Sequence, residues 1–101
     1  MPLHLKTHLA GAFKYPEGKA LLNRTAVGDA LFLKREPTNL YDDNAIQVFA
    51  KDGDKEILCG YIPRTDAAKL KDKILLGAKR DEQWDWLTVF IEGDEPEQKA
   101  A

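Results

Sequence analysis

A cluster of polar side chains and one tyrosine stands between two apolar stretches in the middle of the chain. Within six positions the sequence places Asn39, Tyr41, Asp42, Asp43 and Asn44. Asparagine and aspartate side chains often bond their own backbone in tight turns, and this interpretation alone explains the amides and carboxylates. It does not explain Tyr41, whose flat apolar ring and hydroxyl suit stacking against a nucleobase. The cluster is therefore compatible with two interpretations, a turn held by its own side chains and a ligand pocket.

Two further groups of the same character lie elsewhere in the chain. Lys14 and Tyr15 follow the first apolar stretch, and Tyr61 and Arg64 lie where a predicted strand gives way to a predicted helix. Taken singly, each is an ordinary surface residue. Taken with the central cluster, they supply stacking rings, cations for phosphates and a carboxylate that can accept a hydrogen bond from a sugar hydroxyl. This combination predicts a pocket for a short single-stranded nucleic acid with a terminal 3′-hydroxyl.

Composition limits the kind of nucleic-acid binding that is possible. The chain has 101 residues, is 44% hydrophobic and carries a net charge of −2, so we expect one small domain without a global positive field. Positive charge is instead concentrated locally, because residues 1–35 hold six basic and two acidic side chains. This pattern argues against a protein that coats long DNA and favours one that makes a few contacts.

Cysteine content and hydropathy indicate the compartment. Cys59 is the only cysteine, so it forms no internal disulfide, and its apolar neighbours predict a buried thiol. No stretch approaches the ~18 apolar residues of a membrane span, and the N-terminus lacks a signal-peptide pattern. We expect a cytoplasmic protein without membrane contact.

Hydrophobic periodicity predicts a mainly β fold with one helix (α+β), in the order β-β-β-β-α-β. The helix begins near Thr65 and ends at Gly77, and one more helical turn is expected in the first connection. Five short strands and a helix suit a small OB-like or SH3-like barrel. We expect a single domain over residues 1–91 and an acidic, frayed tail over 92–101. The predicted strands are 3–9, 30–35, 45–50, 57–62 and 84–91.

From Leu5 to Leu76 the sequence resembles the HIRAN domain family. The shared motifs are FKYPEG, VGD, REPTNLYDDNAIQV and GYIPR, in the family's order. The resemblance implies an OB-like fold that captures the 3′-hydroxyl end of single-stranded DNA in DNA repair or replication-fork processing. It also implies a separate ATPase, helicase or nuclease as a candidate partner, and no cofactor. The DNA-binding residues that it implies are Lys14, Tyr15, Asn39, Tyr41, Asp42, Tyr61 and Arg64.

Four positions depart from the family pattern. Lys14 stands in place of an arginine, Pro16 in place of an aromatic residue, Leu40 in place of a common proline, and Tyr61 in place of a histidine. Lysine lacks the flat two-pronged fork with which arginine grips a phosphate.

An enzyme and a protein-interaction module are the alternatives. Glu36, Asp42 and Asp43 offer oxygen ligands for a divalent metal, but adjacent residues of an extended segment point to opposite sides. No nucleophile–base pair is visible, so we expect no catalysis. A protein-interaction module would need Trp84, Trp86 and Phe90 to form an exposed patch. Burial of these rings under the helix or a neighbouring strand is the simpler expectation.

Overall fold

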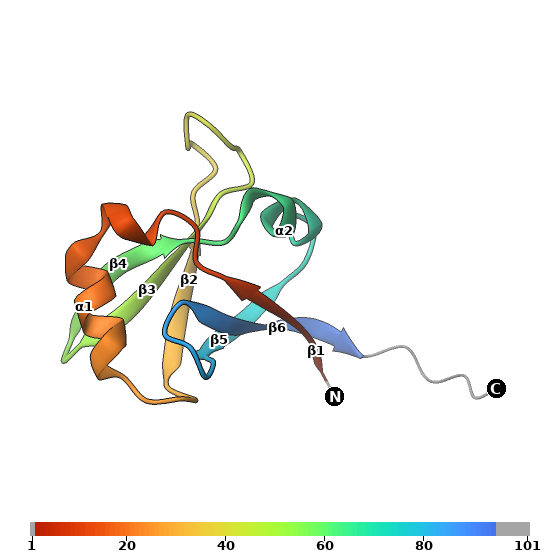
Figure 1. The fold of residues 1–101 in the computed structure, drawn as a ribbon. Coiled ribbons are helices and arrows are strands. Elements are labelled where there is room, and N and C mark those ends of the chain that lie inside the picture. Colours follow the sequence, from red (N-terminus) through yellow and green to blue (C-terminus); the bar gives the residue numbers. More distant parts are fainter. Residues whose placement is uncertain (1, 95–101) are drawn as a thin grey trace.

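The computed structural model describes residues 2–94, which form six strands, two α-helices and one short 3-10 helix (Figure 1). The 3-10 helix η1 is Ala12–Lys14, and the α-helices are α1, Pro16–Arg24, and α2, Arg64–Lys69. None of these helices is long and apolar enough to cross a membrane. The strands are β1 Pro2–His8, β2 Ala30–Arg35, β3 Ile46–Asp52, β4 Lys55–Tyr61, β5 Leu75–Arg80 and β6 Trp86–Asp94.

All six strands join one antiparallel sheet in the order β1-β6-β5-β2-β3-β4. The mainly β fold with a helical minority is therefore confirmed, but the sheet is open and does not form a closed barrel. Its two edges still approach each other at one point. There Ala10 and Tyr61 exchange both backbone hydrogen bonds, with N–O distances of 2.7 Å and 3.0 Å.

The core lies inside the bend of this sheet. Strand β3 shows the alternation that places it there, because Ile46, Val48 and Ala50 are buried while the side chains between them are half-exposed. Helix α1 covers this half of the core and packs against β4 through Gly18. A Cβ atom at Gly18 would lie 2.6 Å from the Cα atom of Cys59, which is fully buried, as expected.

The structure corrects two predicted elements. The helix expected to reach Gly77 ends at Lys69, and the chain then forms β5, in which Leu75 pairs with Ile91 of β6. Backbone pairing with an already paired neighbour outweighs a short helical period of apolar residues. In the first connection, the helical turn expected near Lys19 is a nine-residue helix that starts at Pro16. Proline at the first helical position is favourable because its missing N–H would have no partner there.

Strand β6 also differs from expectation at its end. It continues to Asp94, three residues into the segment that we expected to fray, and residues 95–101 lie outside the described part of the chain. Its partners β1 and β5 flank it, so it is an inner strand of the sheet. Trp84, two residues before this strand, packs against the core, whereas Trp86 at its start is 40% exposed, so the expected burial is wrong for Trp86.

Candidate functional site

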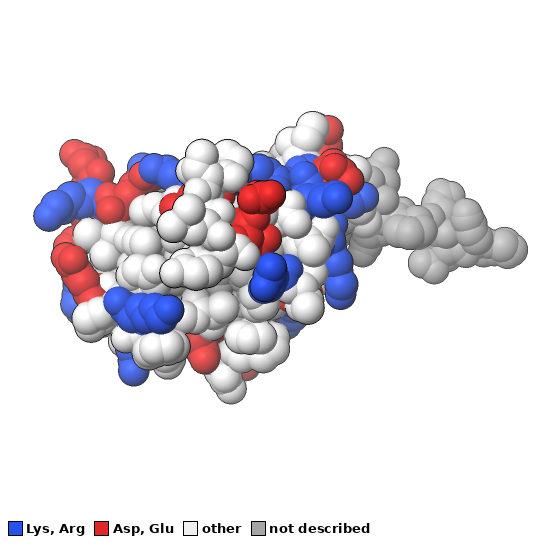
Figure 2. Space-filling model, turned by 90° about the horizontal axis from the view of Figure 1, so that it is seen from above, with Lys and Arg blue, Asp and Glu red and all other residues white. Residues whose placement is uncertain are grey.

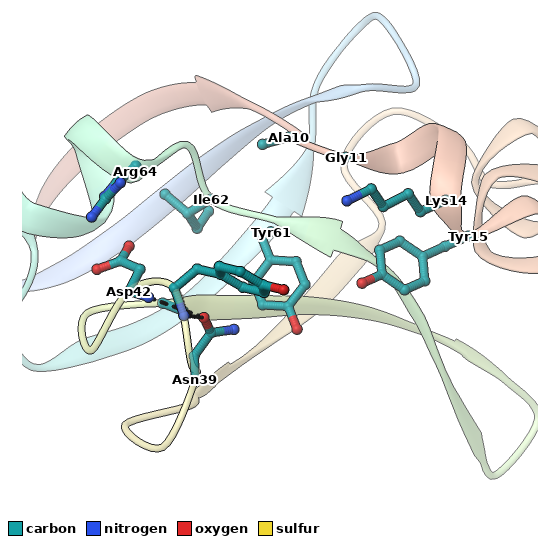
Figure 3. Close-up of a pocket in the computed structure, with 11 residues that line it drawn as sticks. Ala10, Gly11, Lys14, Tyr15, Asn39, Asp42, Tyr61, Ile62 and Arg64 are labelled. Carbon is teal, nitrogen blue, oxygen red and sulfur yellow. Dashed lines mark hydrogen bonds between the residues drawn. The ribbon is translucent and has the colours of Figure 1, made fainter.

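One cavity of about 360 Å³ lies where the two edges of the sheet approach each other (Figure 3). Seen from above, this face is mostly uncharged at its centre, with basic and acidic side chains around it (Figure 2). All seven residues chosen from the sequence line this cavity. They are Lys14, Tyr15, Asn39, Tyr41, Asp42, Tyr61 and Arg64.

Three separate parts of the chain supply these side chains. Lys14 ends η1 and Tyr15 connects it to α1, and Asn39, Tyr41 and Asp42 belong to the connection between β2 and β3. Tyr61 ends β4, and Arg64 begins α2. The bridge between Ala10 and Tyr61 holds the first and third parts together, so the cavity depends on the two sheet edges meeting.

The connection between β2 and β3 is held by its own side chains. The Asn39 Oδ1 atom accepts hydrogen bonds from the backbone N–H groups of Tyr41 at 2.8 Å and Asp42 at 3.0 Å. Asp42 Oδ1 accepts a third from the N–H of Asn44 at 2.9 Å. The expected turn chemistry is therefore present, and it leaves the second oxygen of Asp42 without a partner among residues 2–94. The same side chains thus shape the turn and line the cavity.

Glu36 connects the two sides of the cavity, and sequence reasoning considered it only as a metal ligand. Its Oε1 atom accepts a hydrogen bond from Asn39 Nδ2 at 2.7 Å and another from the Tyr61 hydroxyl at 2.9 Å. Burial and this hydrogen bond raise the pKa of Tyr61 to about 12. Tyr61 therefore stays a neutral donor at physiological pH, and its ring is held in one orientation.

Aromatic rings surround the opening in two different ways. The ring centroids of Tyr15 and Tyr61 lie 6.2 Å apart with planes inclined by 47°, a favourable tilted arrangement. Tyr41 is 84% exposed, and the neighbouring Leu40 is 92% exposed, so this part of the rim projects into solvent. A base can enter beside the first pair and contact Tyr41 from outside.

Charge at the cavity is mixed. Lys14 and Arg64 carry the positive charges, and neither forms an ion pair within residues 2–94. Asp42 supplies the negative charge on the same wall as Arg64 (Figure 3). The carboxylates considered as a metal site do not come together, since the described residues contain no group of three metal-ligating side chains. The arrangement can therefore hold a phosphate and a hydroxyl at neighbouring points.

Comparison with known proteins gives a consistent result. The HIRAN domain model matches residues 5–80. The crystal structure of the HIRAN domain of human HLTF is similar, with a TM-score of 0.65 and 22% identity over 96% of this chain and 81% of that one. A structure of a protein from Lactobacillus plantarum has a TM-score of 0.62 and 27% identity over 90% of this chain and 93% of that one.

The search of curated proteins gave no match. The family match covers most of the chain, and the open six-stranded sheet with its helices has the same fold as both solved structures. The chain therefore belongs to the HIRAN domain family, a family of nucleic-acid-binding modules.

Proposed function

We propose that this protein binds single-stranded DNA and recognises its 3′-hydroxyl end. One observation carries the proposal: the carboxylate of Asp42 lines the same cavity as Lys14, Arg64 and the tyrosine pair. A site for internal phosphates alone gains nothing from a carboxylate, because the two negative charges repel. A free sugar hydroxyl, in contrast, donates a hydrogen bond to it.

Each side chain then has a role that its chemistry supports. The terminal base stacks against Tyr15 or Tyr61, whose rings already stand in a tilted pair. Lys14 and Arg64 contact the phosphate that precedes the terminal sugar. The unpartnered oxygen of Asp42 accepts the hydrogen bond from the 3′-hydroxyl, while its other oxygen keeps the turn in shape.

The test compares oligonucleotides that differ only at their ends. Fluorescence anisotropy is measured with a free 3′-hydroxyl, with a 3′-phosphate, and with the 3′ end blocked so that only the 5′ end is free. We expect the free 3′-hydroxyl to bind about ten- to a hundredfold more tightly, the range for one hydrogen bond to a charged group. Equal affinity for all three ligands contradicts end recognition, and absence of binding at low salt contradicts nucleic-acid binding as a whole.

The proposed setting is DNA repair or replication-fork processing, beside a separate ATPase, helicase or nuclease. The sequence contains no phosphate-binding GxxxxGK[ST] motif that would supply a motor. A bound 3′ end should be protected from a 3′→5′ exonuclease, while digestion from the 5′ end proceeds at the same rate as without protein. Equal protection of both ends would indicate coating of the strand, which the net charge of −2 disfavours.

A further inference from the structure

The strands next to the pocket carry a second surface of aromatic and basic residues. Residues directly opposite each other in an antiparallel sheet share a face, so the register assigns each side chain. Phe32 of β2 lies opposite Phe49 of β3, which lies opposite Leu58 of β4. We call this surface the Phe32–Phe49 face. Its members are Phe32, Lys34, Gln47, Phe49, Lys51, Glu56 and Leu58.

This face is turned away from the core. Val48 and Ala50, which alternate with its members along β3, are buried on the other side, where α1 packs. Phe32, Phe49 and Leu58 remain half-exposed. Three apolar side chains in adjacent positions on a solvent-facing sheet surface form a site that a ligand can cover.

Two lysines lie over the two phenylalanine rings in a symmetric arrangement. The Lys34 Nζ atom lies 4.8 Å from the ring centroid of Phe49, and the Lys51 Nζ atom lies 4.8 Å from that of Phe32. Each pair joins diagonal positions of the β2–β3 ladder. The lysines also act on Glu56, whose pKa is lowered first by the hydrogen bond from Lys34 and further by the charge of Lys51. Glu56 lies opposite Lys51 on the same face and forms an ion pair with Lys34, so two positive charges and one negative charge surround the rings.

The Phe32–Phe49 face is continuous with the pocket. Lys34 lies opposite Gln47, and Gln47 lies opposite Tyr61, which is itself part of the pocket wall. This row is the next one along the strands from the row of Phe32 and Phe49, at a spacing of roughly 7 Å for two residues of a strand. A chain that leaves the pocket past Tyr61 meets Phe49 next.

We propose that the Phe32–Phe49 face binds the nucleotides that precede the 3′-terminal one, which extends the proposed end-binding site into a short track for single-stranded DNA. Bases stack on Phe49 and Phe32, and Lys34 and Lys51 move from the rings to the neighbouring phosphates. This inference rests on the proposed function, because the pocket sets the starting point of the track. The two lysines lie over the two rings, and this combination of ring and positive charge matches the alternation of base and phosphate along single-stranded DNA.

The first test is the dependence of affinity on length. Oligothymidylates with a free 3′-hydroxyl, from two to about eight nucleotides, are titrated by calorimetry, since small single-strand-binding folds cover a few nucleotides or more. Affinity should rise as the oligomer grows beyond the part that fills the pocket, and then level off. A constant affinity from the shortest oligomer onwards would overturn the proposal.

Variants test whether the rise in affinity with oligomer length comes from the Phe32–Phe49 face. Phe32→Leu and Phe49→Leu keep an apolar side chain at these half-exposed positions and remove the stacking ring, so we expect the fold to be retained. Each should weaken binding of the longer oligomers about five- to a hundredfold, the range for one base–aromatic stack, and leave the dinucleotide unaffected. Lys79 and Phe90 supply a matched control, because the Lys79 Nζ atom lies 5.8 Å from the Phe90 centroid on another part of the sheet. Phe90→Leu should change neither affinity, and an equal loss in Phe90→Leu and Phe49→Leu would overturn the assignment.

A 3′-phosphate series separates this inference from the end-binding proposal. If both are right, 3′-phosphate oligomers bind more weakly at every length but keep the same gain with length. If only the end-binding proposal is right, the penalty for the 3′-phosphate persists and the gain with length is absent. If only the track exists, the two end groups bind equally and Phe49→Leu still removes the gain.

Discussion

The hydroxyl of Tyr61 donates a hydrogen bond of 2.9 Å to the carboxylate of Glu36, across the gap between the end of β4 and the end of β2. The same carboxylate oxygen also holds the amide of Asn39. One acceptor therefore fixes both a ring of the pocket wall and the turn that carries Asp42. Positioning of this kind matters because a binding group that is already oriented loses less entropy when the ligand arrives.

Replacing Glu36 tests this arrangement. In Glu36→Ala the Tyr61 hydroxyl and the Asn39 amide lose their partner, so we expect a loss of about 1–3 kcal/mol in the free energy of unfolding and weaker binding of 3′-hydroxyl ends. The pKa of Tyr61 should fall from about 12 toward its ordinary value of 10, as measured by ultraviolet titration. Glu82→Gln, at an exposed carboxylate away from the pocket, is the control. An unchanged Tyr61 titration in Glu36→Ala would contradict the role given to Glu36.

Stability at high pH should depend on Tyr61. Its pKa is about 12 in the folded protein and 10 in an unstructured chain, so the folded state holds the phenolic proton more tightly. This contribution to the free energy of unfolding is fully present below pH 10 and is lost as the pH rises toward 12. Between pH 10 and 12 the free energy of unfolding of Tyr61→Phe should fall by about 1–2 kcal/mol less than that of the wild type, a modest difference because the ring is partly exposed. Urea unfolding between pH 9 and 12 measures this difference, with Tyr41→Phe, at an exposed tyrosine, as the control.

Asp42→Asn should remove the preference for a 3′-hydroxyl without disturbing the turn. An asparagine oxygen can still accept the hydrogen bond from the N–H of Asn44, so the backbone is retained. Loss of the negative charge weakens the 3′-hydroxyl complex and removes repulsion from a 3′-phosphate. The ratio of the two affinities should therefore shrink about ten- to a hundredfold. Asp43→Asn, next to it but outside the cavity, should keep the wild-type ratio.

Lys14 should contribute equally to the binding of every single-stranded DNA, whatever its end group. Lys14→Ala is expected to weaken binding regardless of the end group and to lower the slope of log affinity against log salt by about 0.7, the value for one phosphate contact on a single strand. Lys14→Arg should bind at least as tightly as the wild type, because the guanidinium can contact a phosphate with two hydrogen bonds. Lys71→Ala, an exposed lysine outside the cavity, should leave the slope unchanged. A loss restricted to 3′-hydroxyl ligands would contradict a phosphate contact.

Gly18→Ala should destabilise the fold although it raises helix propensity. The new Cβ atom would press against the carbonyl oxygen of Leu58 and lie 2.6 Å from the Cα atom of Cys59, so α1 must move away from β4. We expect the free energy of unfolding to fall by about 1–3 kcal/mol, whereas helix propensity alone would raise it by up to ~1 kcal/mol. Thermal or urea unfolding shows whether the variant is less or more stable than the wild type. Ala20→Gly, at an exposed position of the same helix, reports the propensity effect by itself.

The sequence could predict five of the six strands because their signals are local. Alternation in β3 and the aspartate–glycine turn after it follow from short-range rules. The turn at Asn39 is equally local, since its hydrogen bonds reach only two and three residues along the chain. The chain places Lys14, Asp42 and Tyr61 around one cavity, and their role in binding DNA stays a prediction.

Features decided by distant pairing could not be predicted in the same way. Ala67, Leu70 and Ile74 have helical spacing, yet Ile74 is 59% exposed and the next residue pairs with Ile91 in a sheet. Glu36 acquires its role from Tyr61, 25 residues further on, and no local motif marks that contact. The Phe32–Phe49 face likewise appears only once the register of β2, β3 and β4 is known.

The bridge between Ala10 and Tyr61 has a consequence for the order of assembly. Its partners are far apart in the sequence, so we expect their contact to form after the intervening strands have been placed. A chain that lacks this bridge would keep the local turn at Asn39 but not the complete cavity opposite it. A ligand of this cavity selects the fully assembled sheet, and by mass action it raises the midpoint of global unfolding. Ligand binding and the stability of the assembled sheet are therefore thermodynamically linked.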